Sequence, residues 1–464
     1  MAEPLWTSDE IVVATGARLA GAPFAAGGVS IDTRTLEPGD LFVALAGERD
    51  GHEFVAQALA HGAAGVLVSQ PTGGPAIEVD DTLRALEKLG EAARARAPQA
   101  RRGAVTGSVG KTSVTQAIRA GLERAGNSHG SVKSYNNHIG VPLTLARMPR
   151  DTLRAVFEIG MNHAGEITPL TRMVQPHAVV ITTVGQAHIE AFADGEAGVA
   201  RAKAEIFEGL ADGGVAVLNA DNRWFDFLAG EAKARGAGVV AFGSDAACAA
   251  QLTGFRLEDD GARVEARLRG RPVSLALRQS GAHWGLMSLA ALLLLDALGV
   301  SFDEGIAALA DFAPLEGRGA EHEVALPGGP FTLIDESYNA NPVSVGAALQ
   351  TLGLKSARRR IAVLTDMLEL GANAPAYHAG LAPEVEAARV DLVFCAGPMM
   401  RSLWEALPPT RQGAYAETAA ALGPLVTRAI EPGDLVMVKG SKASNAKALF
   451  DALASLDARS GEAA

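Results

Sequence analysis

Cysteine is scarce in this sequence: Cys248 and Cys395 are the only 2 cysteines in 464 residues. Two thiols so far apart form neither a disulfide framework nor a CxxC metal site, so both classes of protein are excluded. Cys395 ends the apolar run DLVFCAG (391–397), and we expect it to be a buried thiol without a catalytic role. The chemistry of the protein must therefore come from other residue types.

A long apolar run is also missing. The longest one, Leu289 to Leu295, is followed by Asp296 and falls short of the ~20 residues that a membrane span needs. The first residues, MAEPLWTSDE, contain no basic segment followed by an apolar core, so we expect no secretory signal. These absences predict a cytoplasmic protein without a membrane span.

Positive charge is the third shortage. The chain has 41 Lys and Arg against 53 Asp and Glu, which argues against nucleic acid as the main partner, because phosphate backbones attract clustered Lys and Arg. Local basic loops can still bind an anionic substrate. The apolar content of 48% is typical of a globular protein, and at ~150 residues per domain the length suggests about three domains.

Short apolar runs that alternate with helical patterns predict parallel sheets covered by helices, which is the α/β class. We divide the chain into a mixed α/β domain (1–97), a central parallel-sheet domain (98–315) and a second doubly wound, Rossmann-like domain (316–464). The Ala/Arg-rich segment Glu91–Arg102 is the expected first linker, and APLEGRGAE (313–321) marks the second boundary. The small-residue tail after Asp457 is expected to fray.

The expected strands are spread over all three domains. In chain order they are DLFVAL (40–45), GVLVS (65–69), GAVTG (103–107), RAVFEIG (154–160), HAVVITTVG (177–185), GVAVLNAD (214–221), FTLIDES (331–337), RRIAVLTDM (359–367), DLVFCAG (391–397) and DLVMVKGS (434–441). Residues 252–278 differ, because their apolar residues alternate around an Asp260-Gly261 turn. This pattern predicts a small antiparallel sheet appended to the central domain.

The stretch AVTGSVGKTSVTQ (104–116) contains Gly110-Lys111-Thr112 between a predicted strand and a predicted helix. The usual P-loop has a glycine five residues before Gly110, where this chain has Val105. Backbone N–H groups at the helix start would surround phosphate oxygens, Lys111 would reach the β- and γ-phosphates, and the Thr112 hydroxyl would ligate Mg²⁺. The alternative is an ordinary strand-to-helix turn with a solvated lysine. The strand, the helix and GKT at their junction favour phosphate binding.

Three further residues are candidates for the same site. Glu158 ends the predicted strand in FEIGMNHAGEI (157–167), where it could ligate magnesium beside the phosphate loop, although strand-end glutamates also lie on surfaces. His188 closes the next strand, ITTVGQAH, and could serve the same metal, although a strand-end histidine is more often structural. Lys203, in ARAKAEIFEG, has the pattern of an exposed helical lysine. None of the three decides the function alone.

Taken together, the motifs of this chain resemble those of the Mur ligase family. In chain order they are TGSVGKTS (106–113), YNNHIGVPLT (135–144), EIGMNHAGEI (158–167), TTVGQAHIEAF (182–192), ARAKAEIF (200–207), GRG (317–319) and DESYNANP (335–342). The resemblance runs from near the start of the chain to VKGS (438–441), and these ligases use a shorter TGxxGKT/S loop, which accounts for Val105. DESYNANP together with DMLELGA (366–372) is similar to the family member that adds D-alanyl-D-alanine to UDP-N-acetylmuramoyl-tripeptide.

The resemblance implies an ATP-dependent ligase that acts through an acyl phosphate and a tetrahedral intermediate. Its products would be the UDP-muramoyl-pentapeptide precursor of peptidoglycan, ADP and phosphate. By similarity, Lys111 and Thr112 hold the ATP phosphates and a first Mg²⁺, Glu158 and His188 bind a second Mg²⁺, and CO₂ converts Lys203 to a carbamate. A carbamate makes physical sense there, because Mg²⁺ repels an ammonium whereas a carbamate oxygen can ligate the metal.

The resemblance also assigns two sets of binding residues. The ATP contacts are Thr106, Gly107, Ser108, Val109, Gly110, Lys111, Thr112, Ser113, His283, Arg318, Asp335, Tyr338, Asn339 and Asn341. The substrate contacts are Ser30, Thr33 and Arg34 in SIDTR (30–34), Arg49, Asp50 and His52 in GERDGHEF (47–54), and Asn136 and Asn137 near the metals. Arg34 and Arg49 supply positive charge for a diphosphate, and Arg318 suits a phosphate clamp. Tyr338 could equally be a core residue, and each N-terminal candidate an ordinary turn residue.

Two residues depart from the family pattern. Met287, in GAHWGLMSLAA (281–291), stands where the family usually has an asparagine that contacts adenine. A thioether can pack against the base but cannot form the paired hydrogen bonds of an amide, so base selectivity or ATP affinity could differ. Thr365 precedes Asp366 where the family usually has glycine, which affects the local turn more than the reaction.

Two alternatives are weighed against this assignment. A folylpolyglutamate-synthase-like ligase would be expected to have a DGAHN-like hinge in place of DESYNANP and does not need the two N-terminal loops. A nucleotide-binding regulatory protein without catalysis is suggested only by Met287, and retention of the residues assigned to the metals argues against it. We expect an active, monomeric ligase whose domains move when its ligands bind, because the loops for ATP and for the UDP substrate lie in different domains.

Overall fold

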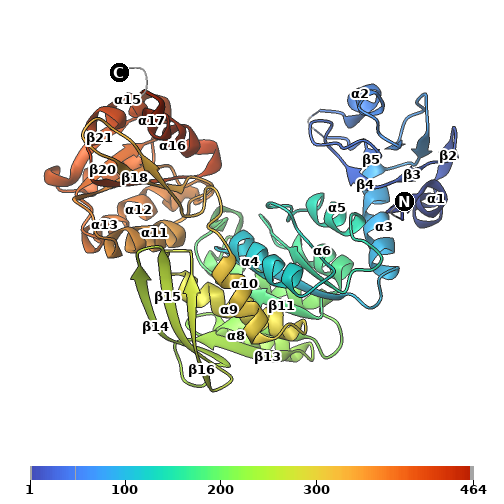
Figure 1. Ribbon diagram of the computed structural model, residues 1–464, viewed down its shortest axis with the longest axis horizontal. Helices are drawn as coiled ribbons and strands as arrows, with labels where there is room; N and C mark the ends of the chain where they lie inside the picture. The colour runs from blue at the N-terminus through green and yellow to red at the C-terminus, as the bar shows by residue number, and fades with distance from the viewer. Residues whose placement is uncertain (1–2, 48, 460–464) are drawn as a thin grey trace.

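Three α/β domains follow one another along the chain, each built around its own sheet, and the predicted fold class is confirmed. The computed structural model describes residues 3–47 and 49–459. Figure 1 shows the N-terminal and C-terminal domains at opposite ends of the molecule, with the central domain between them. Residues 456–459 form a helix, and the rest of the tail that we expected to fray lies outside the described residues.

The N-terminal domain has a five-stranded sheet of order β2-β7-β6-β5-β4, which is parallel except where β2 pairs with β7. Its elements are β1 (Trp6–Thr7), α1 (Ser8–Thr15), β2 (Arg18–Ala20), β3 (Ala25–Ala26), β4 (Gly28–Ser30), β5 (Asp40–Val43), η1 (Gly51–Phe54), α2 (Val55–Ala60), β6 (Gly65–Val68), β7 (Ala76–Glu78) and α3 (Thr82–Ala95). Leu41, Leu67 and Ile77 on the strands pack in one buried cluster with Leu86 and Leu89 of α3. The predicted runs at 40–45 and 65–69 thus form β5 and β6.

The segment Glu91–Arg102 is not a linker, contrary to our prediction. α3 continues through it to Ala95, and β8 already begins at Arg101. Alanine and arginine are strong helix formers, so the compositional bias that suggested a linker is a helix signal. The Arg96 guanidinium stacks on the Trp6 ring, 3.7 Å from its centroid, and Nη1 donates to Leu5 O at 2.6 Å. The connection between the first two domains is therefore short and anchored.

The central domain has a nine-stranded sheet of order β16-β15-β14-β13-β12-β11-β8-β10-β9. Its elements are β8 (Arg101–Thr106), α4 (Lys111–Arg124), β9 (Ser128–Gly130), α5 (Gly140–Ala146), β10 (Arg154–Glu158), α6 (Ile167–Val174), β11 (Ala178–Ile181), η2 (Ile189–Ala191), α7 (Glu196–Ala204), η3 (Glu205–Gly209), β12 (Val215–Asn219), α8 (Phe225–Ala234), β13 (Gly238–Gly243), β14 (Ala250–Glu258), β15 (Gly261–Leu268), β16 (Arg271–Leu277), α9 (Trp284–Ala297) and α10 (Phe302–Asp311). Alternate strand residues enter two buried clusters, Ala104 and Phe157 in one, Val105 and Val156 in the other. The strands from β14 to β9 are parallel, so the carboxyl ends of β8, β10 and β11 meet at one edge, where open α/β sheets bind ligands.

The alternating segment at 252–278 belongs to this same sheet. Its strands β14, β15 and β16 are antiparallel as predicted, with the turn before Gly261. β14 also pairs in parallel with β13 through Phe242 and Ala250, so the three strands extend the central sheet and do not form a separate one.

The C-terminal domain has a six-stranded sheet of order β17-β18-β22-β19-β20-β21, which is parallel except for the edge strand β17. Its elements are β17 (Ala320–Val324), β18 (Phe331–Glu336), α11 (Pro342–Leu354), β19 (Arg359–Thr365), η4 (Gly371–Asn373), α12 (Ala374–Ala379), α13 (Ala382–Ala387), β20 (Leu392–Ala396), α14 (Met400–Ala406), η5 (Pro409–Arg411), β21 (Gln412–Ala416), α15 (Ala419–Ala429), β22 (Asp434–Lys439), η6 (Lys442–Ser444), α16 (Ala446–Ala454) and α17 (Leu456–Arg459). Two separate buried clusters include residues of these strands, as in a doubly wound sheet. The predicted Rossmann-like unit is present.

The apolar run Leu289–Leu295 lies buried in α9 and packs in the same cluster as central strand residues. Within residues 3–47 and 49–459, no helix is long and apolar enough to cross a membrane. Cys395 is fully buried in β20, and burial raises the pKa of its thiol, as expected of a structural cysteine.

Candidate active site

The turn between β8 and α4 has the backbone of a phosphate-binding loop. Gly107 has a φ of 151°, and a Cβ there would lie 1.9 Å from Thr182 Oγ1, so the position requires glycine. Gly110 precedes α4 in the left-handed region (φ 84°), and a Cβ there would lie 2.6 Å from Met287 Cε. The first N–H groups of a helix have no acceptor within it, so the start of α4 can bind an anion.

The loop that follows β11 holds this turn in place. Ser108 N donates to Thr183 O at 2.8 Å, and Ser108 Oγ donates to Gly185 O at 3.1 Å. Thr182 Oγ1 donates to Val109 O at 2.5 Å. Two segments far apart in the sequence therefore fix the shape of the phosphate loop together.

Lys111 folds back over the loop, where its Nζ donates to Gly107 O at 2.7 Å. Burial lowers the pKa of this ammonium, with nearby Glu158 acting in the opposite direction and Arg318 lowering it further. Thr112 Oγ1 accepts from Arg318 Nη2 at 3.1 Å. A guanidinium from the C-terminal domain thus lies at the hydroxyl that we predicted to ligate Mg²⁺, and a bound phosphate would stabilise both cations.

Glu158 ends β10 as predicted, but its side chain is fully buried and not on the surface. Its Oε1 accepts from Asn136 Nδ2 at 2.6 Å and from Ser134 Oγ at 3.1 Å. Its Oε2 is also buried and has no hydrogen-bond partner among the described residues. Leaving a buried carboxylate oxygen unpaired is costly, so a cation is a fitting partner for it.

His188 does not close a strand, contrary to our prediction. β11 ends at Ile181, and the residues between Ile181 and His188 form the loop that supports the phosphate turn. His188 has a φ of 55° and precedes η2. Its Nδ1 lies 2.5 Å from Oε2 of Glu369 in the C-terminal domain, at ion-pair distance but without a hydrogen bond in the described part of the chain. The ring still lines the same cavity as Glu158.

The helical pattern around Lys203 alone suggested an exposed lysine. The structure instead buries Lys203 in α7. Burial lowers the pKa of its ammonium well below the usual value, and Lys111 lowers it further. No hydrogen bond or ion pair of its amine is found among the described residues. It is absent from the cavity-lining residues that the structure describes, yet it lies close enough to Lys111 for their charges to interact. A buried lysine without a counter-charge favours the neutral, nucleophilic amine.

The C-terminal domain supplies one wall of the site. The Arg318 guanidinium stacks on the Tyr338 ring, 4.1 Å from its centroid, and Tyr338 is 37% exposed, which argues against the core role considered for it. Lys439 Nζ donates to Glu336 Oε2 at 3.0 Å and to Asn339 O at 3.1 Å. This side of the cavity therefore combines a stacked guanidinium with a partly buried ion pair.

Three other predicted residues shape the surroundings. Asp335 is buried, and it accepts from Gly317 N at 3.1 Å and from Ser337 Oγ at 2.6 Å, so it holds the hinge. Asn341 caps α11, and Asn137 Oδ1 accepts from backbone N–H groups at the start of α5. Their contacts with ATP or substrate stay predictions.

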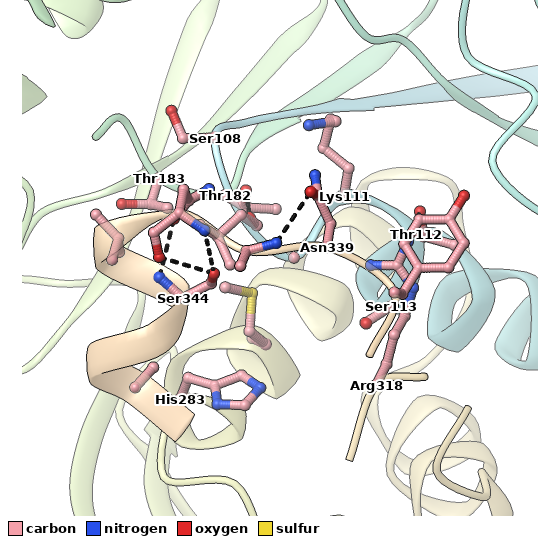
Figure 2. A pocket seen from close by; sticks show the side chains of 18 of the residues that line it. Ser108, Lys111, Thr112, Ser113, Thr182, Thr183, His283, Arg318, Asn339 and Ser344 are labelled. Atoms are coloured by element: carbon pink, nitrogen blue, oxygen red, sulfur yellow. Dashed lines mark hydrogen bonds between the residues drawn. The ribbon is translucent and has the colours of Figure 1, made fainter. Parts of the chain in front are cut away.

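These residues surround a cavity of about 380 Å³ between the central and C-terminal domains, a volume typical of a small-molecule site. Figure 2 shows side chains from both domains around it, including Lys111, Thr112 and His283 from the central domain and Arg318 and Asn339 from the C-terminal domain. The predicted residues in its lining are Ser108, Val109, Gly110, Lys111, Thr112, Ser113, Asn136, Glu158, His188, His283, Arg318, Tyr338, Asn339 and Asn341. Thr106, Gly107, Asp335 and Asn137 are not among the lining residues that the structure describes.

The cavity fits a metal ion that is shared with a ligand. The described residues contain no group of three or more His, Cys, Asp or Glu side chains that could hold a metal on their own. Mg²⁺ is usually held by one or two carboxylates together with substrate phosphates and water. The Thr112 hydroxyl suits one such shared ion, and the unpaired Glu158 oxygen with the His188 ring suits a second.

The two departures from the family pattern are both accommodated. Met287 lines the cavity and packs against Gly110 at the phosphate loop. His283 is half-buried beside it, and desolvation lowers the pKa of its imidazole. Thr365 Oγ1 is 2.6 Å from Ser444 Oγ, and a Cβ at Gly440 would lie 1.6 Å from that hydroxyl, so the glycine makes room for the threonine.

Apart from Asn136 and Asn137, the predicted substrate residues lie in the N-terminal domain and are not among the lining residues of this cavity that the structure describes. Exposed Arg34 pairs with Asp32, with Nη2 and Oδ2 2.6 Å apart. Asp50 caps η1 by accepting from His52 N at 3.0 Å, and its Oδ1 lies 2.6 Å from His52 Nδ1. The Arg49 guanidinium stacks on Phe54, 4.6 Å from the ring centroid.

Two more N-terminal candidates are buried. Ser30 Oγ donates to Asp32 O at 3.1 Å, and Thr33 Oγ1 donates to Gln57 Oε1 at 3.3 Å. Glu48, in the same GERDGHEF motif, lies outside the described residues. Substrate contact by the N-terminal set stays a prediction.

Sequence reasoning missed several lining residues, although it quoted the motifs that contain most of them. The missed polar residues are Ser134, Asn162, Thr182, Thr183, Asn219, Glu336, Ser344 and Lys439. Asn219, Glu336 and Lys439 end the parallel strands β12, β18 and β22. Position at the carboxyl end of a parallel strand is the signal that could have found these three.

Three family models match this chain. They are "Mur ligase family, catalytic domain" over residues 26–96, "Mur ligase middle domain" over 105–295 and "Mur ligase, glutamate ligase domain" over 323–442. Together they span most of the sequence. The chain belongs to the Mur ligase family.

Individual relatives place the chain more narrowly. The UDP-N-acetylmuramoyl-tripeptide–D-alanyl-D-alanine ligase of Escherichia coli strain K12 is 36% identical over 401 residues, 86% of this chain and 87% of that protein. The protein of the same name from Bacillus subtilis strain 168 is 32% identical over 426 residues, 89% and 90% of the two chains. A solved MurF structure from Acinetobacter baumannii matches with a TM-score of 0.85 at 28% identity, covering 97% of this chain and 99% of that one. Within the family, the chain groups with the MurF ligases.

A folylpolyglutamate synthase structure from Mycobacterium tuberculosis also matches, with a TM-score of 0.61 at 18% identity over 79% of this chain and 94% of that one. That likeness shows a shared fold alone. It gives no support to the folylpolyglutamate-synthase-like alternative.

Proposed function

We propose that this protein is the ATP-dependent ligase that joins D-alanyl-D-alanine to UDP-N-acetylmuramoyl-tripeptide. The products are UDP-muramoyl-pentapeptide, a peptidoglycan precursor, with ADP and phosphate. The names of the relatives and the DESYNANP and DMLELGA motifs support this choice of substrates. The observation that carries the reaction class is the cavity in which the start of α4, the unpaired Glu158 oxygen and Arg318 meet.

Two anions must approach each other in this reaction, the γ-phosphate of ATP and the terminal carboxylate of the tripeptide. The N–H groups of α4 and the Lys111 ammonium would bind the phosphates, and Arg318, stacked on Tyr338, would clamp them from the C-terminal domain. Mg²⁺ held by Thr112, with a second ion held by Glu158 and His188, would offset the charge that develops during transfer.

The reaction then has two steps. A carboxylate oxygen attacks the γ-phosphorus and ADP leaves, which gives an acyl phosphate. The free amine of D-alanyl-D-alanine attacks the acyl carbon, loses a proton, and the tetrahedral intermediate expels phosphate. Holding the reactants in line is the main task of the cavity walls, because a carboxylate is a weak nucleophile.

Lys203 is proposed to act as a carbamate. Its neutral amine would attack the carbon of CO₂ and lose a proton, so that a buried amine becomes an anion close to Lys111. The full burial of the amine and its lowered pKa support this step, because only the unprotonated form reacts. The carbamate would also add negative charge close to Lys111, where Glu158 already acts on it.

The N-terminal domain is proposed to hold the UDP end of the substrate through Ser30, Thr33, Arg34, Arg49, Asp50 and His52. Figure 1 places that domain at the far end of the molecule from the C-terminal domain, so the substrate would have to bridge domains and draw them together. We keep the division at residues 1–97, 98–315 and 316–464, a monomer as the working state and the cytoplasm as the site of action.

The test is an omission series. Phosphate release is measured with ATP, UDP-N-acetylmuramoyl-tripeptide and D-alanyl-D-alanine, and then with each left out in turn, while mass spectrometry identifies the product. We expect phosphate and pentapeptide product only when all three are present. Release without D-alanyl-D-alanine, or no release with the full set, would refute the assignment.

A further inference from the structure

The central and C-terminal domains also meet beside the cavity, between η2 and the loop at 366–372. Ile189 of η2 packs against the buried C-terminal cluster that contains Leu370. Glu190 N donates to Glu369 O at 3.3 Å. The His188–Glu369 pair lies within this docking contact, with Nδ1 and Oε2 2.5 Å apart. The two loops therefore touch through an apolar side chain, a backbone hydrogen bond and the close contact of the His188 ring with the Glu369 carboxylate.

Both members of the pair have a backbone conformation that is rare outside glycine. His188 has a φ of 55° and Glu369 a φ of 63°, both in the left-handed region. Such conformations persist only where the surrounding structure holds them, and they cluster at functional sites. Each loop is thus shaped to present its side chain to the other.

A carboxylate beside one imidazole nitrogen decides what the other nitrogen can do. With Glu369 facing Nδ1, the ring proton is favoured on Nδ1, and Nε2 keeps its lone pair for a metal. Nδ1 and Oε2 lie at ion-pair distance, although no hydrogen bond of Nδ1 is found among the described residues in the present ring orientation. This contact gives a structural role to Glu369, the glutamate of the DMLELGA motif.

We propose that Glu369 is a positioning residue supplied by the C-terminal domain, which fixes the orientation of His188 and so completes the second Mg²⁺ site only when the two domains are docked. This rests on the proposed function, because it takes His188 as a ligand of the second Mg²⁺. Coupling is reciprocal, so metal binding at His188 also stabilises the docked arrangement. Arg318 at Thr112 makes a second link between the same domains at the phosphate side.

The test titrates Mn²⁺, an electron-paramagnetic-resonance probe for Mg²⁺ sites, into protein saturated with a non-hydrolysable ATP analogue and UDP-N-acetylmuramoyl-tripeptide. We expect wild-type protein to bind two Mn²⁺. Glu369→Ala should bind the second ion about 10- to 100-fold more weakly, the usual effect of removing a residue that orients a metal-ligating histidine. Affinity for the first Mn²⁺ and for the ATP analogue should stay within about twofold, which a general packing defect would not leave intact.

Two further variants keep the result interpretable. Glu369→Gln preserves the size of the side chain and should weaken the second ion less than Glu369→Ala does. Glu386→Gln removes an exposed carboxylate of α13 in the same domain and should behave as wild type. Small-angle scattering should show that Mn²⁺ compacts the wild-type protein more than it compacts Glu369→Ala.

The outcomes separate this inference from the proposed function. Two Mn²⁺ bound to Glu369→Ala with wild-type affinity would overturn the role of Glu369 and leave the ligase assignment standing. A single Mn²⁺ in wild-type protein would overturn the role of Glu369 together with the two-metal part of the proposed function.

Discussion

The central and N-terminal domains both contain predicted binding residues, but these residues differ in how far their own neighbours satisfy them. In the central domain, Glu158 has a buried oxygen without a hydrogen-bond partner in the described chain, and the pKa of Lys203 is lowered by burial. In the N-terminal domain, Arg34 pairs with Asp32 and Asp50 caps η1. The comparison teaches that the central site costs stability until a ligand completes it, whereas the N-terminal loops keep their shape alone.

Replacing the buried amine of Lys203 should have the largest effect on the difference between the two domains. We expect Lys203→Met to lower kcat by about 10³-fold or more, because it removes the proposed carbamate and its charge from the metal site. The same change should raise the free energy of unfolding by roughly 1–2 kcal/mol, since a thioether tolerates burial better than an amine. Steady-state kinetics in bicarbonate-containing buffer check the first expectation, and thermal unfolding in CO₂-free buffer checks the second. Wild-type activity in Lys203→Met would remove the carbamate from the mechanism.

Glu158→Gln should have the next largest effect. The amide keeps the shape of the side chain but loses the charge that pairs with a cation, so kcat should fall by about 10²-fold and more Mg²⁺ should be needed for half-maximal activity. The measurement is activity as a function of Mg²⁺ concentration at saturating substrates. Unchanged Mg²⁺ dependence would mean that the unpaired oxygen does not serve a metal.

Arg34→Ala tests the N-terminal domain, whose predicted binding residues are already paired with their neighbours. Because Arg34 is exposed and proposed only to bind the diphosphate, we expect KM for the UDP substrate to rise by about 10-fold with kcat unchanged. Arg18→Ala is the matched control, since Arg18 is also exposed, paired with Glu78 and in the same domain. Equal kinetics for the two variants would show that the SIDTR loop does not bind the substrate.

The smallest effect concerns pH. The folded-state pKa of Lys203 lies below its unfolded value, so the unfolded chain binds more protons between the two values and wild-type stability rises with pH there. Lys203→Met lacks this contribution, and its stability advantage should therefore shrink as pH rises toward about 10, by at most about 1.4 kcal/mol per pH unit. Denaturant unfolding of both proteins at several pH values in CO₂-free buffer measures the difference. A constant difference across the series would contradict the lowered pKa.

Much of the fold could be predicted because the central strands are short apolar runs. β10, β18, β19, β20 and β22 were all expected, since strands buried on both faces are apolar almost throughout. β9 (Ser128–Gly130) and β17 (Ala320–Val324) were missed, because edge strands are short or polar and have little periodicity.

The sequence predicted which residues form the site better than it predicted how those residues are arranged. The motifs named Glu158, His188 and Lys203, but their burial depends on the packing of distant segments. His188 was placed on a strand because ITTVGQAH looks continuous, whereas Thr182 leaves the sheet to bond Val109 of the phosphate loop. The contact of His188 with Glu369 joins two domains, and no local pattern in either loop reports it.

The central claim is that this cavity activates a carboxylate as an acyl phosphate, and transfer of an isotope tests it directly. UDP-N-acetylmuramoyl-tripeptide labelled with ¹⁸O at both oxygens of its terminal carboxylate is incubated with the enzyme, ATP and D-alanyl-D-alanine, and the mass of the released phosphate is measured by mass spectrometry. The account predicts one ¹⁸O atom in each phosphate, because a carboxylate oxygen becomes the bridging oxygen of the acyl phosphate. Unlabelled phosphate formed together with the pentapeptide product would contradict it.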